Sequence, residues 1–177
     1  MSDHKQNVIN RVNEVSEELL SLSHKIHANP EVAWQEFESS AAVIKTLSDH
    51  GFDVVEQVSA IPTAFRAEFG SGDLTVALCA EYDALPGLGH ACGHNIIASS
   101  SVGAAIALAS VAKDLNIRVV VLGTPAEEGG GGAVRMMDDG LFEHHPCDAV
   151  FAMHNMPGMP VGHLVFRDGA AMASSDY

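Results

Sequence analysis

Three short segments of this chain are almost wholly apolar, and helix-like stretches separate them. They span residues 74–80, 117–122 and 149–153. Strands that are covered on both faces of a sheet have this uniform composition, because neither face meets water. The stretches between them, residues 95–112 and 132–141, are predicted helices. The order therefore predicts an α/β fold, a mostly parallel three-layer sheet with helices on both faces and right-handed crossovers.

Two helices and a strand are predicted ahead of this unit. Apolar residues recur at steps of four and three over residues 8–26, which predicts a helix with one face packed on a core. A second helix is predicted over residues 36–50 and ends at Gly51, which suits a left-handed cap. Residues 65–69 alternate apolar and polar, as in a half-exposed strand near a sheet edge.

Composition limits the class of partner. The 177 residues, 47% of them hydrophobic, suffice for one domain with a sizeable core. The formal net charge of -14 disfavours nucleic acid and anionic membrane surfaces. The amino terminus lacks the apolar stretch of a signal peptide, and no run approaches the ~20 apolar residues of a membrane span. We therefore expect a cytoplasmic protein that acts on a small molecule.

Polar side chains follow each of the three apolar segments. Glu81 and Asp83 come after the first segment. Glu127 and Glu128 come after the second, and His154 follows the third. The carboxyl ends of parallel strands meet at one edge of a sheet, which is where open α/β sheets bind ligands. We expect these side chains to line one crevice.

Cysteine and histidine donors point to a metal. Cys92 and His94 stand at the start of the predicted helix 95–112, where a helix N-terminus favours thiolate over thiol. Together with Glu128 and His154 they make a plausible site for zinc or a similar divalent ion. Cys-x-His alone is a weak signal, since a loop cysteine beside a capping histidine gives the same letters. Donors from three strand ends strengthen the metal interpretation.

The adjacent Glu127 and Glu128 are the most telling pair. They lie between a buried strand and a run of four glycines. Adjacent carboxylates repel each other, and a solvated surface pair is not expected at such a place. Near a metal, one can bind the ion while the other takes a proton from water and passes it to the leaving amine. The alternative is an acidic first turn of a helix.

The remaining cysteines and histidines are weaker candidates. Cys79, in an apolar strand, and Cys147, beside a proline, are expected to be inert packing. His27 and His90 lie nearer to the motifs and could equally orient loops. The other histidines are expected to face solvent or helix ends: His4, His24, His50, His144, His145 and His163.

Five motifs in this order resemble the metallopeptidase family of aminoacylase and carboxypeptidase relatives. The resemblance is to the amidohydrolase branch that includes hippurate, auxin-conjugate and aminobenzoyl-glutamate hydrolases, and it spans almost the whole chain. The motifs are IHANPE at residues 26–31, EYDALP at 81–86, HACGH at 90–94, TPAEEGGGGA at 124–133 and HNMP at 154–157.

The resemblance implies a function and a role for individual residues. The implied function is hydrolysis of an amide bond of N-acyl amino acids or dipeptide-like substrates with water activated by two divalent metal ions, Zn or Mn. Glu127 would be the general base and acid, and Asp83 would support the metal site from behind its ligands. The implied ligands, with the Cys92 thiolate bridging the ions, are Cys92, His94, Glu128 and His154.

The sequence departs from the family pattern in two ways. Many members of this branch have an aspartate after Cys-Gly-His and a further histidine, whereas Asn95 follows here, which leans toward aminobenzoyl-glutamate hydrolase-like and dipeptidase-like members. Family chains are also much longer, with an inserted lid domain that dimerises and a last ligand histidine after it. The resemblance therefore implies that residues 1–177 are the N-terminal part of the catalytic domain of a homodimer, without lid or C-terminal segment.

Two other functions stay open. The chain could be an inactive metal-binding or interaction remnant, because a half-built crevice cannot position a substrate. Alternatively, Cys92 could be a nucleophile activated by a histidine, although neighbours in sequence seldom align for this and the glutamate pair would then have no role. Turnover by the chain separates the remnant from an enzyme, and inactivation by a chelator excludes the cysteine nucleophile.

Overall fold

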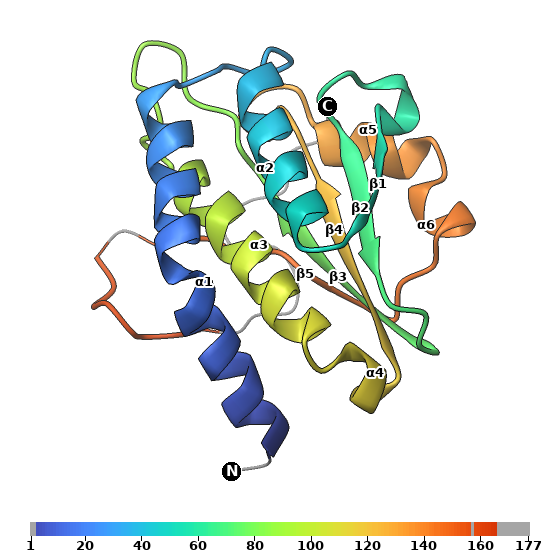
Figure 1. The fold of residues 1–177 in the computed structure, drawn as a ribbon. Helices are drawn as coiled ribbons and strands as arrows, with labels where there is room; N and C mark the ends of the chain where they lie inside the picture. Colours follow the sequence, from blue (N-terminus) through green and yellow to red (C-terminus); the bar gives the residue numbers. More distant parts are fainter. Residues whose placement is uncertain (1–2, 157, 166–177) are drawn as a thin grey trace.

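The computed structural model describes residues 3–156 and 158–165. Pro157 of the last motif and residues 166–177, where the lid was expected to begin, lie outside this part. Figure 1 shows the elements, which in chain order are α1 (Asp3–Ala28), α2 (Phe37–Asp49), β1 (Asp53–Glu56), the 3-10 helix η1 (Val58–Ala60), β2 (Phe65–Phe69), β3 (Leu74–Ala80), α3 (His94–Ala109), α4 (Ala112–Leu115), β4 (Ile117–Gly123), α5 (Gly132–Asp138), α6 (Leu141–His144) and β5 (Ala149–Phe151).

The strands form one five-stranded sheet in the order β1-β2-β4-β3-β5. β3 is parallel to both β4 and β5, and Ala77 pairs with Val120 on one side and Val150 on the other. The predicted parallel unit of three strands is confirmed. β1 and β2 are antiparallel to each other, and β2 is antiparallel to β4, so the complete sheet is mixed.

Helices cover both faces of the sheet, as predicted for three layers (Figure 1). Successive residues of β4 explain its apolar composition. Val119 and Val121 lie in the core beneath α1, α2 and α3, whereas Val120 and Leu122 lie in the core beneath α5 and α6. A strand whose alternate side chains enter two cores has little room for polar residues, and the charged residue of β4, Arg118, stands near its start.

The third apolar segment differs from its prediction. It forms a strand only over Ala149–Phe151, and the side chains of Val150 and Phe151 are 44% and 51% exposed. The expectation of cover on both faces is wrong here, because β5 is the edge strand of the described sheet. Composition alone cannot show which strand lies at an edge.

The two predicted crossover helices are each divided. The segment 95–112 becomes α3 and the short α4, and the segment 132–141 becomes α5 and α6. Gly140 lies between the latter two at a φ of 83°, a conformation that ends a helix. Among the described residues, no helix is long and apolar enough to cross a membrane.

Candidate metal centre

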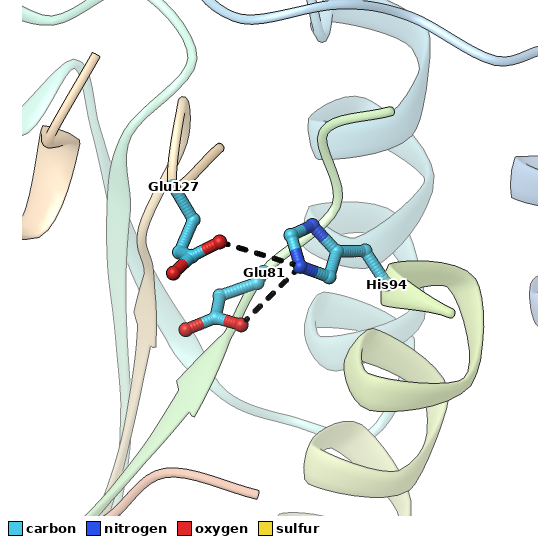
Figure 2. Close-up of side chains that lie close together, drawn as sticks. All are labelled: Glu81, His94 and Glu127. Carbon is cyan, nitrogen blue, oxygen red and sulfur yellow. Dashed lines mark ion pairs between the residues drawn. The ribbon is translucent and has the colours of Figure 1, made fainter. Parts of the chain in front are cut away.

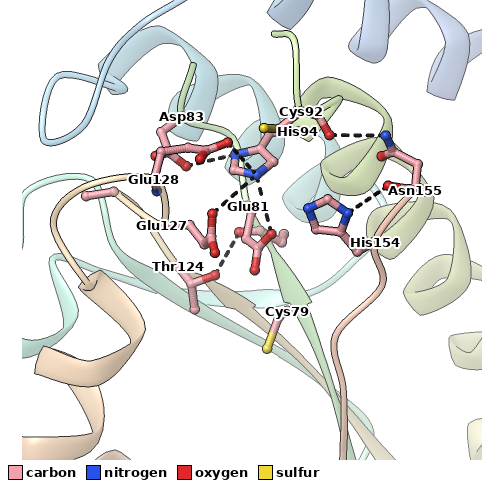
Figure 3. A network of polar contacts seen from close by, with 12 residues as sticks. Cys79, Glu81, Asp83, Cys92, His94, Thr124, Glu127, Glu128, His154 and Asn155 are labelled. Atoms are coloured by element: carbon pink, nitrogen blue, oxygen red, sulfur yellow. Dashed lines mark hydrogen bonds and ion pairs between the residues drawn. The ribbon is translucent and has the colours of Figure 1, made fainter. Parts of the chain in front are cut away.

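The polar residues singled out in the sequence meet at one edge of the sheet (Figure 3). Glu81 and Asp83 follow β3, and His94 is the first residue of α3. Glu127 and Glu128 come from the loop after β4. The backbone N–H of Thr124 donates to the carbonyl oxygen of Ala80 at 3.0 Å, so the ends of the two central strands stay together.

His94 is the centre of this group. Its side chain is fully buried, and Nε2 faces three carboxylates at 3.6–3.7 Å, those of Glu81, Glu127 and Glu128. Figure 2 shows the first two of these contacts. Nε2 of His94, Oε2 of Glu81 and Oε1 of Glu128 are buried without a hydrogen-bond partner. Buried polar atoms are normally satisfied, so this arrangement calls for a further group.

Asp83 fixes the orientation of both His94 and Glu128. Its Oδ1 lies 2.9 Å from Nδ1 of His94, and its Oδ2 accepts the backbone N–H of Glu128 at 3.0 Å. Burial raises the pKa of Asp83, but these hydrogen bonds outweigh burial and hold the pKa below its usual value. Burial lowers the pKa of His94, but the hydrogen bond to Asp83 and the charges of the glutamates outweigh burial and raise it. Because Nδ1 faces Asp83, Nε2 is the ring nitrogen that a cation could bind.

Acidic side chains outnumber basic ones in this group. Burial, with repulsion from neighbouring carboxylates, raises the pKa of Glu81 to about 7. Burial also raises the pKa of Glu127, and Glu128 adds to the rise. These groups resist ionising together unless a cation joins them. One nitrogen or oxygen atom from each of Glu81, His94 and Glu127 lies within 4.8 Å of the others, a spacing that could hold an ion.

Glu81 is the residue of this group to which the sequence interpretation gave no role. Its position directly after the buried β3 is the same signal that identified the other strand-end residues. The signal was therefore present in the sequence. Asp83 drew attention instead because the resemblance assigned it a supporting role.

Without a cation, the surroundings of Cys92 favour the thiol over the thiolate. A hydrogen bond to the carboxylate of Glu128 raises the pKa of Cys92 to about 11, and burial and the nearby carboxylates act in the same direction. The N-terminus of α3 does not outweigh these charges. In the absence of a cation the thiol keeps its proton, which weakens the interpretation of Cys92 as an activated nucleophile.

His154 lies on the same edge but farther out. Its ring centroid is 6.2 Å from that of His94, in an edge-on arrangement, and its side chain is exposed. Asn155 holds this segment by donating from Nδ2 to the carbonyl oxygen of Cys92 at 3.1 Å. Of the four implied ligands, only His94 belongs to the compact group with Glu81 and Glu127. Glu128 contacts His94. Cys92 and His154 flank the group.

The other cysteines, and the histidines near the motifs, do not belong to the group of Glu81, His94 and Glu127. Burial raises the pKa of Cys79 to about 12 and also raises that of Cys147, in accord with inert packing. The rings of His27 and His90 lie 6.3 Å apart, and burial lowers the pKa of His90.

Known proteins resemble this chain in sequence. The model of peptidase family M20/M25/M40 matches residues 77–171. The chain is 40% identical over 164 residues to a mouse (Mus musculus) Xaa-Arg dipeptidase, covering 85% of this chain and 38% of the relative. It is 34% identical over 184 residues to a hippurate hydrolase of Campylobacter jejuni, covering 96% and 48%.

A solved structure gives the same result for the fold. The Bacillus subtilis YXEP protein, described as a dinuclear metal binding peptidase from the M20 family, superposes with a TM-score of 0.76 at 29% identity. The match covers 85% of this chain and 45% of that one. The chain thus spans less than half the length of the relatives it matches.

Proposed function

Because the chain belongs to the M20/M25/M40 peptidase family, we propose that it forms the metal-binding part of an amidohydrolase or peptidase. The reaction is hydrolysis of an amide bond in N-acyl amino acids or dipeptides, the substrate classes that the names hippurate hydrolase and Xaa-Arg dipeptidase indicate for relatives. The observation that carries the proposal is the convergence of three carboxylates on Nε2 of the fully buried His94.

The residues at this edge fit a pair of divalent cations. The buried polar atoms without partners and the excess negative charge both call for positive charge. Imidazole, carboxylate and thiol are the donors that zinc accepts, and imidazole with carboxylate also suits manganese. We assign the ligand roles to Cys92, His94, Glu128 and His154, with Glu81 as a further oxygen donor.

Each remaining side chain has a separate task. When bound, divalent ions polarise the substrate carbonyl and lower the pKa of water. Glu127, whose side chain is 46% exposed, takes the proton from water and delivers it to the leaving amine. Its raised pKa suits this exchange. Asp83 keeps His94 in the orientation and tautomer that a ligand needs.

Hydrolysis tests the proposal. The protein, purified with zinc or manganese, is assayed on N-acyl amino acids and on dipeptides, before and after treatment with a chelator. We expect loss of turnover with the chelator and recovery when metal is restored. Turnover that survives complete metal removal would overturn the proposal. A chain that binds metal but hydrolyses nothing would favour the remnant. The homodimer expected for a chain with the lid domain stays a prediction, and size-exclusion chromatography of such a chain tests it.

A further inference from the structure

A second carboxylate, far from His94 in the sequence, is completely buried. Glu36 precedes α2 and has no exposed surface. Its Oε1 accepts the backbone N–H groups of Trp34 and Ala126, each at 2.9 Å. Its Oε2 accepts the hydroxyl of Thr63 at 2.9 Å. Glu36 therefore joins three segments of the chain that the sheet does not connect at this point.

A buried carboxylate is a poor device for stability alone. Burying a charge is costly, and apolar residues of similar volume are often as good or better at such positions. Three donors compensate Glu36, and two of them are backbone N–H groups whose direction the fold fixes. The role of Glu36 therefore depends on the segments that carry these donors.

One donor belongs to the residue that precedes the glutamate pair. Ala126 has a φ of 57°, in the left-handed region, and it is fully buried. A residue with a side chain loses roughly 1–2 kcal/mol there relative to the right-handed region, so it stays only where its surroundings hold it. The carbonyl oxygen of Ala126 accepts the N–H groups of Gly130 and Gly131, both at 2.9 Å. The conformation of Ala126 thus sets the course of the loop after β4.

The direction of that turn decides where the glutamates point. Beyond Ala126, the N–H of Glu128 reaches Oδ2 of Asp83, and Glu127 faces Nε2 of His94. We propose that Glu36 is the positioning residue of the Glu127-Glu128 pair, which it aims by holding Ala126 in the left-handed conformation. This role rests on the proposed function insofar as the aimed groups serve a metal.

Amide hydrogen exchange tests the contact directly, and metal affinity tests its consequence. In Glu36→Ala we expect the Ala126 amide to lose protection and the affinity for zinc or manganese to fall by ~10-fold or more, as for other residues that orient ligands. In Glu36→Gln the amide oxygen can still accept both N–H groups while its NH2 donates to Thr63, so both readouts should stay near wild type.

Matched variants separate aiming from general stability. Glu31 is the control, because its carboxylate accepts the N–H groups of Glu38 and Ser39 at 3.0 and 2.7 Å and the hydroxyl of Ser39 at 2.7 Å, all from α2, whereas the N–H of Ala126 goes to Glu36. Glu31→Ala should leave Ala126 exchange and metal affinity unchanged. Adding Ala126→Gly to Glu36→Ala should restore part of the affinity, since glycine adopts a positive φ without the penalty.

The proposal fails if Glu36→Ala leaves the Ala126 amide protected, if Glu36→Gln behaves like Glu36→Ala, or if Glu31→Ala weakens metal binding as much. Should Glu36→Ala not fold, Glu36→Asp takes its place, because its shorter side chain cannot reach all three donors. If the wild-type chain binds no metal, the proposed function fails, yet exchange at Ala126 still decides the role of Glu36.

Discussion

Asp83 shows how one buried side chain can set the chemistry of its neighbours. Its two oxygens serve different residues, His94 through the ring and Glu128 through the backbone. The side chains of these two partners also approach each other, with Nε2 of His94 3.6 Å from Oε1 of Glu128. A carboxylate can accept on both oxygens, whereas an amide has one oxygen and one donor. This difference makes the role of Asp83 testable with a change of almost no volume.

For Asp83→Asn we expect metal affinity to fall by ~10–100-fold. An amide has one oxygen, so its NH2 group must face either the N–H of Glu128 or the N–H at Nδ1 of His94, and one of the two hydrogen bonds is lost. Calorimetric titration with zinc measures the loss. Asp73→Asn is the control, since Asp73 accepts from Asn116 in an exposed contact. Equal affinity in wild type and Asp83→Asn would show that His94 does not depend on this contact.

We propose that Glu127 and Glu128 have different tasks, and a pair of variants tests this assignment. Glu127→Gln should keep bound metal and lose ~10²–10⁴-fold in turnover, because an amide cannot take the proton. Glu128→Gln should lose metal instead. Metal content and rate are measured on the same preparations of the hydrolytically active protein. Equal or exchanged effects would contradict the assignment.

The sequence predicted which residues lie at the site, but it did not predict the burial and charges that surround them. Asp83, Glu127 and Glu128 were found because each follows a buried strand. The raised pKa of Cys92 in the metal-free site was not predicted, because the carboxylate that causes it comes from a distant segment. Glu36 carried no signal at all, since its contact with Ala126 joins residues 90 positions apart.

At the scale of elements, the junction of α3 with the 154–155 segment is tightly packed. Gly93 precedes α3 at a φ of 77°, and a Cβ there would lie 2.5 Å from Nδ2 of Asn155. Asn155 in turn holds the segment of His154 against Cys92. The close approach therefore links two of the implied ligands across the start of a helix.

Gly93→Ala should displace Asn155 and weaken both folding and metal binding, by about 1 kcal/mol or more in stability. Gly87→Ala is the matched control, because Gly87 has a φ of 71° but nothing within 4 Å of a new Cβ. Urea unfolding and metal titration of both variants separate strain from collision. If the two variants lose equally, the contact with Asn155 contributes nothing.

Element order was predictable and element partners were not. Uniformly apolar composition identified β3 and β4, because their side chains enter two cores. The same composition in β5 misled, since an edge strand can be as apolar as a central one. The antiparallel addition of β1 and β2 follows from pairing between segments, which no local pattern records.

At the scale of the whole molecule, apolar side chains gather in and after β5. The exposed ones among them are Val150, Phe151, Met153, Met156, Val161, Leu164 and Val165. An open edge strand with such side chains is a site of association between chains.

We expect the 177-residue chain to self-associate through this edge, and Phe151→Lys to shift it toward monomer. Val55→Lys is the control on the opposite edge strand, where Val55 is 52% exposed. Light scattering over a range of concentrations measures the shift. A monomeric wild-type chain, or an equal effect of both variants, would contradict this expectation.

The account as a whole depends on cations at the carboxyl edge of β3 and β4. The most direct measurement is a crystal structure of the protein loaded with zinc, with anomalous scattering used to locate the ions. The account predicts a peak at bonding distance from Nε2 of His94, ~2.0–2.1 Å for zinc and nitrogen, with carboxylate or thiolate donors around it. Ions bound only elsewhere, with Nε2 of His94 left facing the three glutamates, would contradict it.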